Sequence, residues 1–290
     1  MKKIGFGLMI IVFILNGYVF PQAAAPVYGS NTKAGKHIKI DDINMYYETY
    51  GKGEPLLLLH PNGESIEAFS KQIPELQKHF MVIAVDLRAH GRTTDSDKEL
   101  TDTLMANDIK LLLDALKLNA VNLVGWSDGG VIGMRLALDF PQKIKKLVLI
   151  GANYEPAGYQ PAFISMISMA DYQMLPPKTR EKKAAISPNP QRDALVFKKQ
   201  MNLMLKYPHI KPEELANIKI PVMVMAGDHD LIREEHTIKL FQSLPNSYLG
   251  IIPGASHIAP FEKSELVNPI IINFLKRPYA EINRYYFLME

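Results

Sequence analysis

Short runs of apolar residues recur along the chain and predict strands. The runs at 55–59 and 81–85 are apolar at nearly every position, which is typical of strands buried on both faces of a parallel sheet. Further runs of this kind lie at 121–124, 147–150, 222–226 and 248–252. Two alternating segments come before them and predict a hairpin that turns at Asp41 and Asp42. These segments are 37–40 and 45–50.

The stretches between the apolar runs have helical spacing. Residues 100–116 place apolar side chains on or near one side of a helix, and these are Leu104, Ile109, Leu112, Leu113 and Leu116. Further helices are expected at 64–79 with a break at Pro74, at 127–140, and at 262–274 despite Pro269. Apolar strands that alternate with amphipathic helices predict an α/β fold, a mostly parallel eight-stranded sheet with helices on both faces.

Residues 153–217 interrupt this alternation. The segment is helical in pattern and too long for an ordinary connection between two strands, so we expect a helical lid insertion over a site. Its methionines have flexible, polarisable side chains that suit an adaptable apolar pocket, although packing of the lid onto the body explains them equally well. They are Met166, Met169, Met174, Met201 and Met204.

The first 25 residues have the pattern of a secretory signal peptide. Lys2 and Lys3 precede an apolar run at 4–15, and three alanines follow at 23–25. We expect cleavage there, export to the periplasm or the extracellular space, and a single mature domain over 26–290. An uncleaved N-terminal membrane anchor is the alternative.

Charge and cysteine content narrow the possible functions. Cleavage would remove two lysines and no acid, which lowers the net charge from +3 to +1. A nearly neutral chain gives no support for a nucleic-acid or anionic-membrane partner. The chain has no cysteine, so disulfides, thiolate nucleophiles and Cys-based zinc sites are excluded.

The chemistry is expected to centre on Ser127. The sequence Gly125-Trp126-Ser127-Asp128-Gly129 follows one predicted strand and opens a predicted helix. A sharp strand-to-helix turn of this type exposes a serine hydroxyl above the edge of the sheet, and flanking glycines permit the tight backbone. The helix N-terminus favours negative charge that develops nearby. A tight turn without catalytic function is the alternative.

A serine hydroxyl needs a base to become a good nucleophile. His257 follows the last predicted strand, and sites of α/β sheets lie at the carboxyl ends of the strands. His90, in a loop after another strand, is the main rival. The remaining candidates fall in predicted surface segments and are expected to be solvated, namely His37, His79, His209 and His236.

The base needs an acid to orient it, and the tetrahedral intermediate needs donors for its oxyanion. Asp230 follows the strand at 222–226 and gives the chain order Ser, Asp, His that this type of turn predicts; Asp228 is its rival. The expected oxyanion donors are the backbone N–H groups of Asp128 and Asn62. Pro61, before Asn62, has no N–H to donate.

Together these motifs resemble the α/β-hydrolase superfamily. Five segments occur in the superfamily's order and span roughly residues 37–276. They are the loop at His60, the segment 86–93, the strand-to-helix turn at 125–129 (the elbow), the turn at 227–230 and the His257 loop. The resemblance implies Ser127, Asp230 and His257 as nucleophile, acid and base. Relatives that open epoxides or remove halides carry Asp at the position of Ser127, so these two activities are not expected.

Two motifs resemble those of the branch that contains the biphenyl-hydrolase-like, or valacyclovir, hydrolases. They are the elbow extended to Gly130, and Gly151-Ala152-Asn153 after the next strand. In that branch the acid after the nucleophile recognises the α-amino group of amino-acid esters, which implies Asp128 and its elbow neighbour Trp126 as substrate-binding residues. The sequence departs from the usual pattern at Pro61, Ala89 and Thr93.

Asp128 also raises a physical question. A carboxylate beside an oxyanion hole opposes the negative charge that forms there, so it needs a cation. That cation is either a substrate ammonium or an arginine of the chain, with Arg88 and Arg135 as candidates; a helix N-terminal cap is a further alternative.

The expected function is hydrolysis of a small-molecule carboxylic ester through an acyl-enzyme, without metal or organic cofactor. An enol-lactone or carbon–carbon bond hydrolase, or a cofactor-free perhydrolase, would use the same three residues. A binding protein without catalysis is the alternative from another class.

Overall fold

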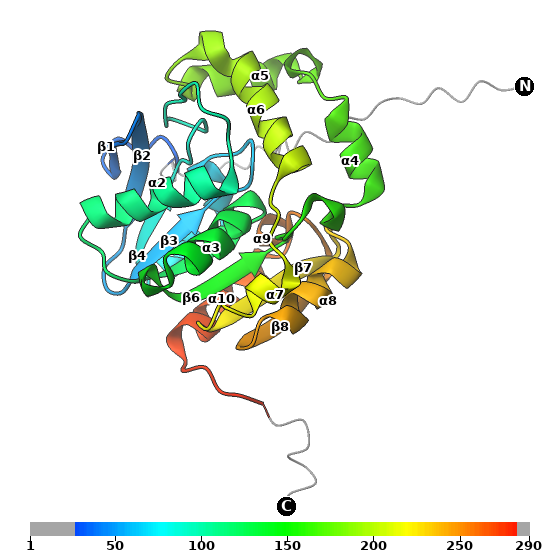
Figure 1. Ribbon diagram of the computed structural model, residues 1–290. Helices are drawn as coiled ribbons and strands as arrows, with labels where there is room; N and C mark the ends of the chain where they lie inside the picture. Colours follow the sequence, from blue (N-terminus) through cyan, green and yellow to red (C-terminus); the bar gives the residue numbers. More distant parts are fainter. Residues whose placement is uncertain (1–26, 283–290) are drawn as a thin grey trace, which may run out of the picture.

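A computed structural model describes residues 27–282, and the predicted signal peptide lies outside them. One eight-stranded sheet runs through the molecule in the order β1-β2-β4-β3-β5-β6-β7-β8 (Figure 1). Its strands are β1 Gly35–Ile40, β2 Ile43–Tyr50, β3 Pro55–Leu59, β4 Met81–Val85, β5 Val121–Trp126, β6 Ile144–Ile150, β7 Val222–His229 and β8 Ser247–Ser256. The six strands β3 to β8 are mutually parallel, while β2 pairs antiparallel with both β1 and β4. The predicted α/β class, the mostly parallel sheet and the hairpin are confirmed.

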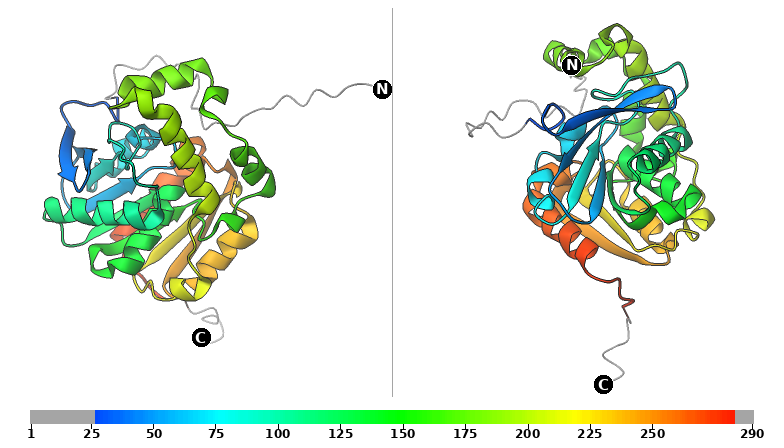
Figure 2. Two further views of the ribbon diagram at one scale, coloured as in Figure 1. Left: turned by 45° about the horizontal axis from the view of Figure 1, so that its top comes forward. Right: turned by 90° about the vertical axis from the view of Figure 1, so that its left-hand side faces the viewer.

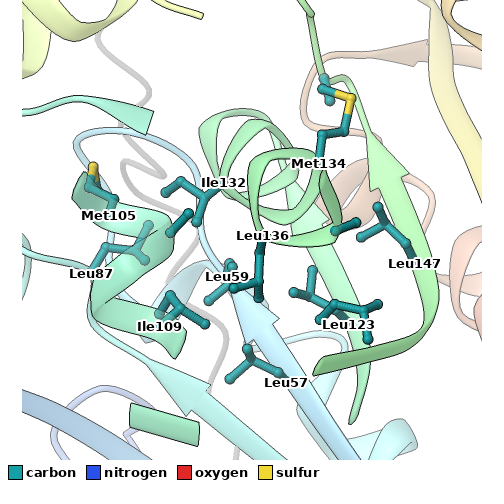
Figure 3. Close-up of a cluster of buried hydrophobic side chains, with 14 of the residues drawn as sticks. Leu57, Leu59, Leu87, Met105, Ile109, Leu123, Ile132, Met134, Leu136 and Leu147 are labelled. Carbon is teal, nitrogen blue, oxygen red and sulfur yellow. The ribbon is translucent and has the colours of Figure 1, made fainter. Parts of the chain in front are cut away.

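Helices cover both faces of the sheet, as the continuous apolar strands predict. On β3, Leu57 and Leu59 pack toward α2 Asp102–Ala115 and α3 Asp128–Asp139, as Figure 3 shows. Leu56 and Leu58 belong to the core on the opposite face, which includes residues of α1 Ile73–Leu76, α9 Ala259–Glu262 and α10 Ser264–Lys276. Because side chains alternate between the two faces of a strand, an all-leucine run fills both cores.

One of the predicted helices differs from the structure. Residues 64–79 form only a short 3-10 turn at Ile66–Phe69 and the one-turn helix α1, because Pro74 has no N–H for a continuing helix and occupies the first turn of α1 instead. The predicted helix at 262–274 is confirmed as α10, which begins two residues later than predicted and contains Pro269, and the short α9 comes just before it.

The segment between β6 and β7 forms a helical cap and then returns to the body. The helices α4 Pro161–Ser168, α5 Pro177–Ile186 and α6 Asp193–Lys206 stand above the carboxyl ends of the parallel strands (Figures 1 and 2). The short α7 Pro212–Leu215 instead packs beside α3 and α8 Glu234–Ser243. Within residues 27–282, no helix has the length and apolar character needed to cross a membrane.

The turn between β5 and α3, which carries Ser127, is pressed against β3. A Cβ added at Gly129, in the first turn of α3, would lie 2.0 Å from the carbonyl oxygen of Leu59. A Cβ at Gly133, one turn later, would meet only the flexible side chains of Leu123 and Leu147 at 3.0 Å. The elbow therefore needs a glycine at position 129 but not at 133.

We expect Gly129→Ala to lower the free energy of unfolding by about 2 kcal/mol, because rigid backbone must move to admit the methyl group. Gly133→Ala is the control and should change stability by less than about 1 kcal/mol, since side chains can adjust and alanine favours the helix. Chemical denaturation measures both. Equal destabilisation by the two substitutions would contradict the close contact between elbow and β3.

Candidate active site

The β5–α3 turn places Ser127 in a strained backbone conformation. Its φ is 54° and ψ is −122°, a region that residues with side chains rarely adopt. The turn is held by its surroundings: the Ser127 N–H donates to the Ile150 carbonyl at 2.8 Å, and a Cβ at Gly125 would lie 2.3 Å from the Gly129 carbonyl oxygen. The strain presents the hydroxyl at the carboxyl edge of the sheet.

Ser127, His257 and Asp230 form one hydrogen-bonded chain. The Ser127 Oγ lies 2.9 Å from His257 Nε2, and His257 Nδ1 lies 2.6 Å from Asp230 Oδ1. Since a carboxylate only accepts, Nδ1 carries the proton toward Asp230 and Nε2 is left to accept from the serine. Asp230 Oδ1 also accepts from the Ile232 N–H at 3.0 Å, which fixes the carboxylate. All three side chains are buried.

The rival residues have other partners. Asp228 accepts from the backbone N–H groups of Gly254 and Ala255 and so fixes the loop that carries His257. His90 contacts the Arg88 carbonyl oxygen at 2.8 Å and Asn62 Oδ1 at 2.9 Å. Neither rival is hydrogen-bonded to Ser127 or His257.

The prediction that His236 is solvated is wrong. Its ring is buried, stacks on Tyr154 with centroids 3.8 Å apart, and accepts the Tyr154 N–H at Nε2. Burial lowers the pKa of His236 to about 4, so the ring is neutral and structural. His37, His79 and His209 are exposed, as expected.

The loop after β3 is fixed from two sides. His60 lies under it, with Nδ1 2.7 Å from the Pro61 carbonyl oxygen and Nε2 accepting the Leu87 N–H. The side chain of Asn62 donates to the Gln200 carbonyl of cap helix α6 at 2.8 Å. The other expected donor, the Asp128 N–H, opens α3 and has no acceptor within that helix.

Asp128 meets neither of the arginines considered for it. Arg88 pairs with Asp108 and Asp42, and Arg135 pairs with Asp102 and Asp139. The cap at the start of α3 is Ser127, with no side-chain capping bond.

The Asp128 carboxylate is therefore left without an arginine partner. Its Oδ2 is buried, and the Tyr159 hydroxyl lies beside it as a donor that acts to lower its pKa. Burial raises the pKa of Asp128 to about 7, although nearby His257 acts to lower it. The same burial, together with Asp128, raises the pKa of Tyr159.

Trp126 is predicted to bind substrate, but the structure places its side chain away from the pocket at Ser127. Its indole N–H donates to the His257 carbonyl at 2.9 Å and its ring packs edge-on against Phe69. Trp126 does not line the pocket at Ser127. The hydrogen bond from its indole instead connects the loop that carries His257 to the elbow.

A pocket of about 100 Å³ lies above Ser127 and His257, and the cap supplies its apolar wall. Met166, Met201 and Met204 line it, whereas Met169 and Met174 are exposed. The methionines thus divide between the pocket and the cap surface. Tyr159 also lines the pocket and brings its hydroxyl to the buried Asp128.

Comparison with known proteins agrees with this geometry. Residues 54–207 match the family model for the alpha/beta hydrolase fold, so the chain belongs to that family. The human serine hydrolase BPHL is 26% identical over 275 residues, which cover 90% of this chain and 92% of that protein, in agreement with the branch that the elbow resembles.

Relatives with other chemistry are also similar. A 2-hydroxy-6-oxo-2,4-heptadienoate hydrolase from Pseudomonas putida is 24% identical, covering 84% of this chain and 97% of that protein. The solved structure of a meta-cleavage product hydrolase from Pseudomonas fluorescens superposes with a TM-score of 0.68 at 18% identity, covering 84% of this chain and 98% of that one. The latter likeness shows the fold alone.

Several site residues carry no local sequence signal. Tyr159, Lys183 and Gln200 come from the cap, and only the folded chain brings them to the elbow. Gly151 belongs to the motif after β6, and the structure shows what it does. Its φ is +56°, and a Cβ there would lie 2.8 Å from the His257 ring and 3.1 Å from Asp230 Oδ2.

We expect Gly151→Ala to reduce kcat/KM about 100-fold, because a methyl group would displace the His257 ring by a fraction of an ångström or more. Gly254→Ala is the matched control: its φ is +63°, yet nothing lies within 4 Å of an added Cβ. Steady-state kinetics on an activated ester compares them. Similar losses in both variants would mean that backbone strain, not contact with His257, causes the effect.

Proposed function

We propose that this hydrolase cleaves carboxylic esters through an acyl-enzyme on Ser127. The observation that carries the proposal is the chain of short contacts from Ser127 through His257 to Asp230. A serine hydroxyl hydrogen-bonded to an imidazole, itself oriented by a buried carboxylate, is the arrangement that activates serine for acyl transfer.

The proposed reaction has two halves. His257 Nε2 takes the proton as Ser127 Oγ attacks the ester carbonyl, and the Asn62 and Asp128 N–H groups face the oxyanion. The protonated His257 then donates to the leaving alcohol. Water, deprotonated by the same nitrogen, attacks the acyl-enzyme and releases the acid. Asp230 stays ionised and stabilises the imidazolium in both halves.

The environment of Asp128 favours esters that carry an amino group. Its carboxylate is buried beside the Tyr159 hydroxyl, and neither Arg88 nor Arg135 neutralises it. Tyr159 lines the pocket and Asp128 does not, so a substrate ammonium would enter past Tyr159 and supply the missing positive charge. The similarity to BPHL supports a serine hydrolase, in line with Ser127 as the proposed nucleophile.

Cleavage of carbon–carbon bonds is the second candidate. It is favoured by the similarity to the heptadienoate hydrolase over most of both chains. A vinylogous ring-cleavage product tested beside simple esters separates the two activities.

We expect Ser127→Ala to lose about 10⁴-fold in kcat on p-nitrophenyl acetate and to lose labelling by a fluorophosphonate, because the substitution removes the hydroxyl that is hydrogen-bonded to His257 Nε2. Ser243→Ala, on exposed α8, is the control and should retain both. Wild-type protein with neither hydrolysis nor labelling would favour the binding-protein alternative.

The role of Asp128 is tested with two esters of equal shape. We expect wild type to prefer an alanyl ester over its isobutyryl counterpart, and Asp128→Asn to reduce that preference by about tenfold or more, since the neutral amide cannot balance the ammonium. The ratio of the two kcat/KM values is the measurement. An unchanged ratio would refute recognition of the amino group by Asp128.

A further inference from the structure

A second, larger cavity adjoins the catalytic pocket beneath α5. Its volume is about 390 Å³, and it lies between the cap and the body loops around residues 63–67 and 89–95. The catalytic pocket alone is smaller than is usual for ligand sites, whereas the second cavity falls in the usual range. Both are lined by the same five residues at their junction, Gly63, Glu64, Lys183, Phe197 and Gln200.

Two of the acidic residues around the outer cavity are neutralised by ion pairs. Glu67 pairs with Lys182 at 2.9 Å, and Asp95 pairs with Arg192 at 2.8 Å. Asp193 has no ion-pair partner within 4 Å among the described residues, but it accepts a hydrogen bond from the Ser187 hydroxyl at 2.7 Å. Lys178, Lys183 and Glu64 likewise have no ion-pair partner within 4 Å in the part of the chain described.

Lys183 stands at the junction itself. Its half-buried ammonium donates to the Gly63 carbonyl, which uses one of three donors. A partly desolvated ammonium that faces two cavities attracts an acceptor more strongly than a surface lysine does. Desolvation lowers the pKa of Lys183, and the carboxylates of Glu64 and Asp193 act against that shift.

We propose that the cavity beneath α5 binds the far end of the substrate and that Lys183 binds a carboxylate there. The preferred substrates would then be esters that carry a second, anionic group remote from the scissile carbonyl. This inference rests on the proposed esterase function and names its substrate class. It is independent of Asp128, which lines neither cavity.

Glu64 makes this preference depend on pH. Burial raises the pKa of Glu64 to about 7, while Lys183 and Lys182 act to lower it and Glu67 acts to raise it. His90 also faces the outer cavity, and burial keeps its pKa low. Below pH 7 Glu64 is mostly neutral and the junction is positive; above pH 7 its charge opposes an anionic ligand.

The test compares p-nitrophenyl hydrogen suberate with p-nitrophenyl octanoate, which match in chain length and differ in the terminal carboxylate. We expect wild type at pH 6.5 to favour the suberate by about tenfold in kcat/KM. Lys183→Met should bring the ratio of the two kcat/KM values to about one, and Lys183→Arg should keep most of the preference. Lys198→Met, an exposed lysine on α6 outside both cavities, is the control of equal charge. A wild-type ratio near one, or the same fall with Lys198→Met as with Lys183→Met, would overturn the proposal.

Two further measurements separate this proposal from the esterase function. Glu64→Gln should preserve the suberate preference at pH 8, where wild type loses part of it; the same loss in both proteins would refute the role of Glu64. Calorimetry with Ser127→Ala should show tighter binding of suberate monoester than of octanoate ester. If wild type hydrolyses both esters without preference, recognition of the remote carboxylate by Lys183 is rejected and the esterase function stands. If wild type binds the suberate ester in a Lys183-dependent way but does not hydrolyse it, the esterase function alone is rejected.

Discussion

The close approach between the start of α3 and the end of β3 is the constraint on which the site depends. Gly129 lies so near the Leu59 carbonyl that only hydrogen fits between them. This contact fixes the elbow that holds Ser127 at a positive φ. It also fixes the elbow relative to the loop that follows Leu59 directly, where Asn62 lies. One backbone contact therefore positions both the serine and the loop expected to receive the oxyanion, before any side chain of the cap is involved.

The cap is bonded to that same loop. Gln200 of α6 accepts from the Asn62 side chain and donates to the Ala89 carbonyl, and Lys183 of α5 donates to the Gly63 carbonyl. A movement of α5 or α6 would therefore disturb the loop beside Ser127. Lys183 and Gln200 line the outer cavity and also bond to the loop that carries Asn62. Binding of a substrate in the outer cavity is therefore physically linked to the position of that loop beside Ser127.

The sequence was most informative where a local pattern determines structure. Continuous apolar runs predicted the parallel strands, and the strand–Gly-x-Ser-x-Gly–helix pattern located the turn at Ser127. The pattern failed at 64–79, where Pro74 and a 3-10 turn override the helical spacing, and at His236, whose burial depends on Tyr154 from a distant segment. Likewise, neither the approach of Tyr159 to Asp128 nor the junction at Lys183 is visible locally, because long-range packing of the cap creates both.

The central claim is that Ser127 is the nucleophile of an acyl-enzyme. Rapid-quench mass spectrometry of the protein mixed with p-nitrophenyl acetate tests it directly, because the covalent intermediate is observed and not inferred from rates. We predict an acetyl group that appears within the first turnover on the peptide containing Ser127 and disappears as substrate is exhausted. Turnover without an adduct on that peptide, or a kinetically competent adduct on another residue, would contradict the assignment.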